Sequence, residues 1–334
     1  MRSVRIQRHM PMQHLHRRHW LRATAALALA GGLPWQAFAE PHPAEPPPPT
    51  VLDIDAVDLQ RQRPVPVRLY LPHAPGPFPL VVFSHGIGGS RQGYTWLGRN
   101  FARHGIASLH LQHVGSDRQL WGGNIFNMVG RLQKAAQETE AIARVQDLRF
   151  ALDMLLTGEL ATYIDAERIV AAGHSYGANT TLLASGASVE REGRVVALRD
   201  DRVRAAIAIS APPFYGESEP QRILQGVTVP SLHVTCTEDI IRIPGYYSGA
   251  DDRVAVFDAV GSDRKWLAVY AGGSHSMFTD RNSGGTLGPR AKQATGALTV
   301  AFVHAVFGGD MGDIRSWPEH HADILARFSA VGAA

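Results

Sequence analysis

The chain has 334 residues, a length that fits one large α/β domain or two small ones. Its formal net charge of +3 would suit a nucleic-acid partner, but positions 1–39 hold six arginines and no acidic residue. Without those six charges the balance is −3, so the rest of the chain has no basic excess and nucleic acid is excluded as a partner. The single cysteine, Cys236, excludes an intramolecular disulfide, and its apolar surroundings predict a buried side chain rather than a catalytic thiol.

Residues 1–39 have the three parts of an export signal: a basic stretch, an apolar run over 23–33 and the small-residue site Ala-Phe-Ala at 37–39. The eleven-residue run is shorter than the roughly 20 residues that cross a bilayer as a helix, so we expect no membrane segment in the mature chain. Arg17 and Arg18, followed by an aromatic residue, a leucine and a base, resemble a twin-arginine signal. An ordinary secretory signal is the alternative, and Met10 or Met12 are alternative starts. Export machinery is therefore an expected partner, and a periplasmic or secreted location is expected.

Residues 40–50 are rich in proline and predict an extended spacer, after which residues 51–334 predict a single folded domain. Two alternating segments, 51–59 and 65–71, are typical of antiparallel strands at a sheet edge. The continuous apolar run at 80–83 predicts a strand buried on both faces. Helix patterns at about 94–104, 142–155 and 291–306 then alternate with strand patterns at 106–111, 168–172, 203–209, 229–235 and 266–270, and the tail has room for one more helix. This alternation predicts an α/β fold with a mostly parallel central sheet flanked by helices.

Residues 173–177 read Gly-His-Ser-Tyr-Gly, a G-x-S-x-G motif placed between a predicted strand and a predicted helix. The glycines allow a sharp turn that lifts the hydroxyl of Ser175 above the sheet. The pentapeptide alone would be a weak signal, and a purely structural turn is the alternative. Its position between strand and helix predicts that Ser175 is a nucleophile.

A serine hydroxyl needs a base, and the base needs an orienting acid. His275, in the small-residue loop after the last predicted parallel strand, is the expected base, because in this kind of site the chain order is serine, acid, histidine. Glu238 and Asp239 both follow the strand at 229–235. Asp239 is preferred because a short side chain at the start of an apolar turn points inward more readily, and Glu238 stays the alternative.

An oxyanion formed during attack needs preorganised N–H donors. One expected donor is the backbone N–H of Tyr176, directly after the nucleophile. The glycine-rich loop at 84–90 predicts a second donor at the backbone N–H of Ile87. His85 is expected to fix this loop by hydrogen bonding rather than to transfer protons.

Neither a metal nor a cofactor is expected. The sequence contains no Cys/His cluster and no H-E-x-x-H motif. The glycines at 86–89 lack the third glycine of a dinucleotide-binding loop.

With these residues in place, the chain resembles the α/β-hydrolase superfamily and, within it, the group of platelet-activating-factor acetylhydrolases and predicted dienelactone hydrolases. Residues 83–91, 173–177 and 273–275 carry the resemblance, which extends over about 80–306. The resemblance implies an α/β-hydrolase fold with Ser175 and His275 catalytic and the N–H groups of Ile87 and Tyr176 in the oxyanion hole.

The sequence departs from these relatives at two places. The eukaryotic acetylhydrolases that it resembles carry their acid after the strand that follows the nucleophile helix, where this chain has Ser-Ala-Pro-Pro at 210–213. Asp239, one strand later, is then the well-placed acid. Dienelactone hydrolases proper use a cysteine nucleophile, which Ser175 replaces. Bacterial cutinases and polyester hydrolases look similar in arrangement, with a nucleophile motif that usually differs.

The sequence therefore predicts an exported serine hydrolase that cleaves carboxylic esters through an acyl-enzyme. The expected substrate is a small-molecule, lipid or polyester ester. An acyltransferase or peptidase on the same triad is the alternative, followed by a non-catalytic binding protein. Six loop aromatics are candidates for the substrate pocket: Trp121, Phe214, Tyr215, Tyr246, Tyr247 and Phe278.

Overall fold

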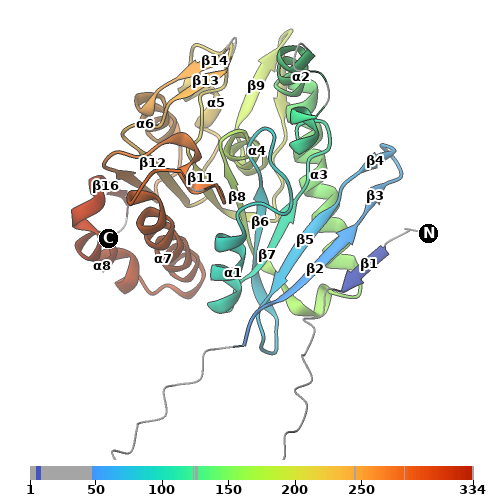
Figure 1. The fold of residues 1–334 in the computed structure, drawn as a ribbon, viewed down its shortest axis with the longest axis horizontal. Helices are drawn as coiled ribbons and strands as arrows, with labels where there is room; N and C mark the ends of the chain where they lie inside the picture. Colours follow the sequence, from blue (N-terminus) through green and yellow to red (C-terminus); the bar gives the residue numbers. More distant parts are fainter. Residues whose placement is uncertain are drawn as a thin grey trace, which may run out of the picture.

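The computed structural model describes residues 5–8, 47–122, 124, 127–243, 246–281 and 283–332. Most of the predicted export signal, and residues 40–46 of the predicted spacer, lie outside this part. Within the signal, strand β1 (Arg5–Arg8) pairs antiparallel with β2 (Thr50–Asp55) at the edge of the sheet (Figure 1).

A large sheet forms the centre of the molecule, with the strand order β1-β2-β5-β7-β6-β8-β11-β12-β15-β16. The pairings from β7 through β15 are parallel, and the strands outside them pair antiparallel. The bounds beyond β2 are β5 (Val67–Leu71), β6 (Phe78–Ser84), β7 (Ala107–Leu111), β8 (Ile164–His174), β11 (Val203–Ile209), β12 (Ser231–Cys236), β15 (Lys265–Tyr270) and β16 (Leu325–Val331). Three small two-stranded sheets pair β3 (Val57–Asp58) with β4 (Arg63–Pro64), β9 (Ser188–Arg191) with β10 (Arg194–Ala197), and β13 (Ile241–Ile243) with β14 (Tyr246–Ser248).

Helices cover both faces of the sheet. The α-helices are α1 (Thr95–Arg103), α2 (Met128–Ala135), α3 (Glu138–Thr157), α4 (Tyr176–Ser185), α5 (Pro220–Leu224), α6 (Ala250–Ala259), α7 (Leu287–Gly308) and α8 (Gly312–His320). One core layer packs α3 and α4 against the sheet, and the other packs α1, α7 and α8 against its opposite face, as Figure 1 shows for α3 and α7.

Strand β6 shows why the apolar run at 80–83 belongs at the centre. Successive side chains of a strand point to opposite faces. Leu80 and Val82 lie in the core layer under α3, and Val81 and Phe83 lie in the layer under α7. All four are almost completely buried, so an uninterrupted apolar run satisfies both layers at once.

The predicted fold class is confirmed: the sheet is mostly parallel and flanked by helices. The tail was expected to have room for one more helix, and it contains α8; it also contains β16, which was not expected and which pairs antiparallel with β15. The polar residues Arg327 and Ser329 obscure the strand pattern, because an edge strand need not be apolar on both faces. None of the helices in the described part of the chain is long and apolar enough to cross a membrane.

Candidate active site

Ser175 lies at the tip of a sharp turn between β8 and α4. Its backbone has φ of +55°, a left-handed conformation that is rare for a residue with a side chain. A Cβ on Gly177 would collide with the backbone carbonyl of Ser84, and one on Gly173 would collide with the carbonyl of Gly177. The two glycines therefore let α4 start directly against β6, and this close approach keeps the strained turn in place.

The structure brings Ser175, His275 and Asp239 together. His275 Nε2 lies 2.8 Å from Ser175 Oγ, and His275 Nδ1 lies 2.7 Å from Asp239 Oδ1. The three residues follow β8, β15 and β12, which run parallel, so their carboxyl ends meet at one edge of the sheet. The arrangement can pass the serine proton to the imidazole and hold the resulting cation beside the carboxylate.

The carboxylate bonded to His275 belongs to Asp239 and not to Glu238, which is exposed. Asp239 is fully buried and also accepts a hydrogen bond from Thr235 Oγ1 at 2.8 Å. Burial alone would raise the pKa of Asp239, but the hydrogen bond and charge of His275 and the nearby Arg253 hold it well below its ordinary value. The carboxylate is therefore ionised across the physiological pH range.

His174, inside the G-x-S-x-G motif, supports His275 in a way that sequence reasoning missed. Its Nε2–H donates to the backbone carbonyl of His275 at 2.9 Å, and its Nδ1 accepts from the Tyr94 hydroxyl at 2.8 Å. Burial lowers the pKa of His174 to about 3, so the ring is neutral at pH 7. The only sequence signal was a histidine at a variable position of the motif, which has no assigned partner until the chain folds.

The two segments that carry the expected oxyanion donors both adjoin Ser175: Tyr176 follows it directly, and a Cβ on Gly86, next to Ile87, would lie 3.1 Å from the Ser175 Cβ. Ile87 follows β6 and Tyr176 is the first residue of α4, where a backbone N–H has no carbonyl one turn earlier to bond. Both residues line the same cavity as Ser175. His85 fixes the loop, as expected, because its Nδ1 lies 2.7 Å from the carbonyl oxygen of Gly86.

Ser175 lines a cavity of about 250 Å³. We call it the apolar cavity, since most of its wall is aliphatic or aromatic: Leu132, Ile142, Leu183, Val196, Leu198 and Phe214. Charged residues occur at its rim, where Arg191 pairs with Glu138 and Glu217.

A second cavity of about 510 Å³ also includes Ser175 and, unlike the first, includes His275. We call it the arginine-lined cavity, because Arg118, Arg242 and Arg281 contribute to its wall. Among the described residues, none of these three arginines forms an ion pair with a carboxylate. The same wall holds one carboxylate, Asp280, so three arginines against one aspartate leave the cavity with a net positive charge.

The six candidate pocket aromatics divide between these surfaces and the core. Phe214, Tyr215 and Tyr246 line the apolar cavity and Trp121 lines the arginine-lined cavity, whereas Tyr247 is exposed and Phe278 is fully buried. Phe278 packs beneath the site against His174 and Tyr270 instead of facing a ligand.

Cys236 is buried, as expected, and burial raises its pKa to about 12. The described residues contain no group of three or more His, Cys, Asp or Glu side chains placed to hold a metal ion.

Residues 64–119 match the family model described as platelet-activating factor acetylhydrolase, isoform II. The matched part contains the expected oxyanion loop and ends before Ser175 and His275. A search of curated proteins finds no match. The expected resemblance is thereby confirmed over this part of the chain, and with the observed sheet it supports an α/β-hydrolase fold and, in general terms, a hydrolase of the esterase or lipase type.

Proposed function

We propose that this protein is a serine hydrolase that cleaves carboxylic esters. The observation that carries the proposal is the hydrogen-bonded chain from Ser175 through His275 to Asp239. It lies at the carboxyl ends of the parallel strands and beside the apolar cavity. The partial match to an acetylhydrolase family supports the same reaction class.

The reaction proceeds in two displacements. His275 Nε2 takes the proton from Ser175 Oγ as that oxygen bonds to the ester carbonyl carbon, and the N–H groups of Ile87 and Tyr176 bind the oxyanion. The tetrahedral intermediate collapses, the C–O bond to the alcohol breaks, and His275 returns its proton to the leaving oxygen. Water then repeats these steps on the acyl-enzyme, which releases the acid and restores Ser175.

The positions of the two cavities support an assignment of the two halves of the substrate. The leaving oxygen must lie next to His275, which protonates it, so the alcohol half occupies the arginine-lined cavity. The acyl half then enters the apolar cavity. We therefore propose an ester with an apolar acyl group and a polar or anionic alcohol part, drawn from small molecules, lipids or polyesters.

An organophosphonate tests the role of Ser175, because it forms a stable tetrahedral adduct with a serine that has both a base and an oxyanion hole. We expect one adduct per chain on the peptide that contains residues 173–177, and loss of both labelling and ester hydrolysis in Ser175→Ala. Ser188→Ala, on β9, is the matched control and keeps both. Hydrolysis that survives in Ser175→Ala, with no adduct on the wild type, overturns the proposal.

We also propose that the enzyme is exported and that the mature chain begins near Glu40. The signal-like pattern of residues 1–39 supports this, although those residues lie largely outside the described structure. N-terminal sequencing of periplasmic protein checks it. Recovery of the uncleaved chain in the membrane fraction contradicts it.

A further inference from the structure

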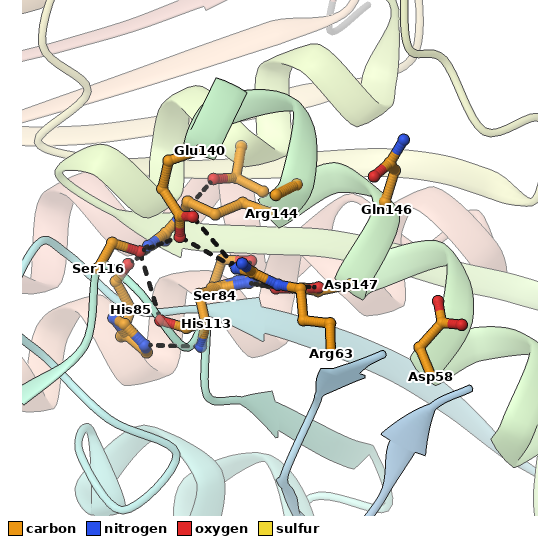
Figure 2. Close-up of polar contacts among 12 residues, drawn as sticks. Asp58, Arg63, Ser84, His85, His113, Ser116, Glu140, Arg144, Gln146 and Asp147 are labelled. Carbon is orange, nitrogen blue, oxygen red and sulfur yellow. Dashed lines mark hydrogen bonds and ion pairs between the residues drawn. The ribbon is translucent and has the colours of Figure 1, made fainter. Parts of the chain in front are cut away.

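Arg144 on α3 is a charged side chain that is completely buried. Figure 2 shows it among the polar side chains of Ser116 and Glu140, close to His85. Charged side chains are rarely buried unless their hydrogen bonds are satisfied. Arg144 donates from Nε to Thr180 Oγ1 at 2.9 Å, from one Nη to Ser116 Oγ at 2.8 Å, and from the other Nη to the backbone carbonyl of His85. Each of the three guanidinium nitrogens thus donates a hydrogen bond.

These contacts connect the two segments that supply the proposed oxyanion donors. The His85 carbonyl belongs to the loop after β6, next to Ile87. On the other side, the Arg144 guanidinium carbon lies 4.5 Å from the centre of the Tyr176 ring, which is a cation–π contact. Thr180, one turn along α4, donates in turn to the Tyr176 carbonyl at 3.2 Å. One side chain therefore sets the distance between the loop and the start of α4.

His85, whose carbonyl Arg144 binds, in turn orients the peptide group between Gly86 and Ile87. Its Nδ1–H donates to the Gly86 carbonyl, which belongs to the same peptide unit as the Ile87 N–H. Carbonyl and N–H point in opposite directions across a trans peptide, so this bond aims the N–H away from His85. His85 Nε2 accepts from the backbone N–H of His113 at 3.1 Å, which fixes the ring tautomer.

The charge of Arg144 stays available to the site. Burial lowers its pKa to about 10, so it remains protonated at pH 7. Its three acceptors are uncharged, and Glu140 reaches it through the Ser116 hydroxyl, which donates to that carboxylate at 2.8 Å. Glu140 is itself paired with Arg63. The positive charge thus faces the Tyr176 side of the oxyanion site without a direct ion pair.

We propose that Arg144 is a positioning residue for the oxyanion hole, holding the Ile87 and Tyr176 N–H groups in register and adding a fixed positive charge behind them. This inference rests on the proposed ester hydrolysis. It assigns Arg144 a role in transition-state stabilisation and not in substrate binding.

The test compares an ester with its thiono analogue, in which sulfur replaces the carbonyl oxygen. Sulfur is larger and a weaker hydrogen-bond acceptor, so an aligned oxyanion hole strongly prefers the oxygen ester. Loss of one oxyanion donor costs about 10²–10³ in kcat, and misalignment of both donors in Arg144→Gln should cost about 10- to 100-fold. We expect kcat to fall with KM nearly unchanged, and the oxo/thiono ratio of kcat/KM to fall with it. Arg144→Lys keeps the charge but cannot make the same three hydrogen bonds, so its oxo/thiono ratio should lie between those of Arg144→Gln and the wild type.

Arg63→Gln is the matched control, because Arg63 belongs to the same buried network but contacts Glu140 and Asp147 rather than His85 or Tyr176 (Figure 2). It should lower the melting temperature and keep the oxo/thiono ratio. If the Arg144 variants do not fold, the double variant Ser116→Ala/Thr180→Val removes two of the three acceptors and should lower the ratio in the same way.

An unchanged ratio in folded Arg144→Gln, or in the double variant, overturns the proposal. That outcome differs from failure of the proposed function, which would appear first as wild-type hydrolysis that does not depend on Ser175.

Discussion

Asp239 is the buried carboxylate bonded to His275, and its negative charge should be required for rapid turnover. In Asp239→Asn the amide cannot stabilise the protonated imidazole, so we expect kcat to fall by about 10⁴. Glu238→Gln is the control one residue away, and it should keep nearly full activity because Glu238 is exposed. Steady-state kinetics on one ester measures both variants. Full activity in Asp239→Asn would show that another carboxylate orients His275.

The contact between α4 and β6 makes a prediction at the scale of an element. Gly177→Ala introduces a methyl group that collides with the Ser84 carbonyl, so α4 must shift away from the sheet. We expect a loss of about 1–3 kcal/mol in the free energy of unfolding and a slower reaction of Ser175 with phosphonate. Chemical denaturation and labelling rates measure the two effects. Gly130→Ala on α2 meets no neighbouring atom and should leave both unchanged. If the two variants have the same stability and the same labelling rate, the close contact between α4 and β6 does not have the role assigned to it.

The loops that form the arginine-lined cavity make a second prediction at this scale. We expect Arg242→Gln/Arg281→Gln to lower kcat/KM more for an ester with a carboxylate on its alcohol part than for the matching neutral ester. The difference should shrink at high salt, because these arginines are exposed and their fields are screened. Arg222→Gln, on α5 away from both cavities, is the control. An equal loss on both esters would place the alcohol half elsewhere.

At the scale of the whole molecule, the five histidines that are buried in the described part of the chain predict sensitivity to acid: His85, His110, His113, His174 and His233. Burial lowers the pKa of each, to about 3 for His110, His174 and His233, against an ordinary value of 6.5. Between these values the unfolded chain binds more protons than the folded chain. The contribution of these neutral histidines to the free energy of unfolding should therefore be fully present above pH 6.5. It should be lost progressively as the pH decreases towards 3.

Urea denaturation between pH 7.5 and pH 4.5 measures this dependence, over a range from about one unit above to about two units below the ordinary histidine pKa. His233 lies away from the site and bonds Ser231, so His233→Leu isolates one contribution. It should reduce by about one the number of protons taken up on unfolding. A slope that is the same in both proteins would mean that His233 is protonated in the folded state.

The alternating pattern of strands and helices was enough to predict the parallel sheet, because periodicity depends on local geometry alone. The same holds for the turn at Ser175, since the two glycines that it requires are its sequence neighbours. The hairpins β9–β10 and β13–β14 were not anticipated. Most of their described residues are exposed or half-buried, so apolar periodicity marks them weakly.

The sequence by itself determined the fold class and proposed which serine, histidine and acid belong together, because those residues follow strands whose ends must meet at one edge. Only the tertiary structure decided that Asp239 rather than Glu238 bonds His275, that His174 bonds the His275 carbonyl, and that Arg144 bonds the His85 carbonyl in the proposed oxyanion loop. These contacts join residues separated by 36, 101 and 59 positions. Such distances along the chain leave no local pattern, and the partner of a buried polar group is fixed only when packing excludes water and every other partner from its surroundings.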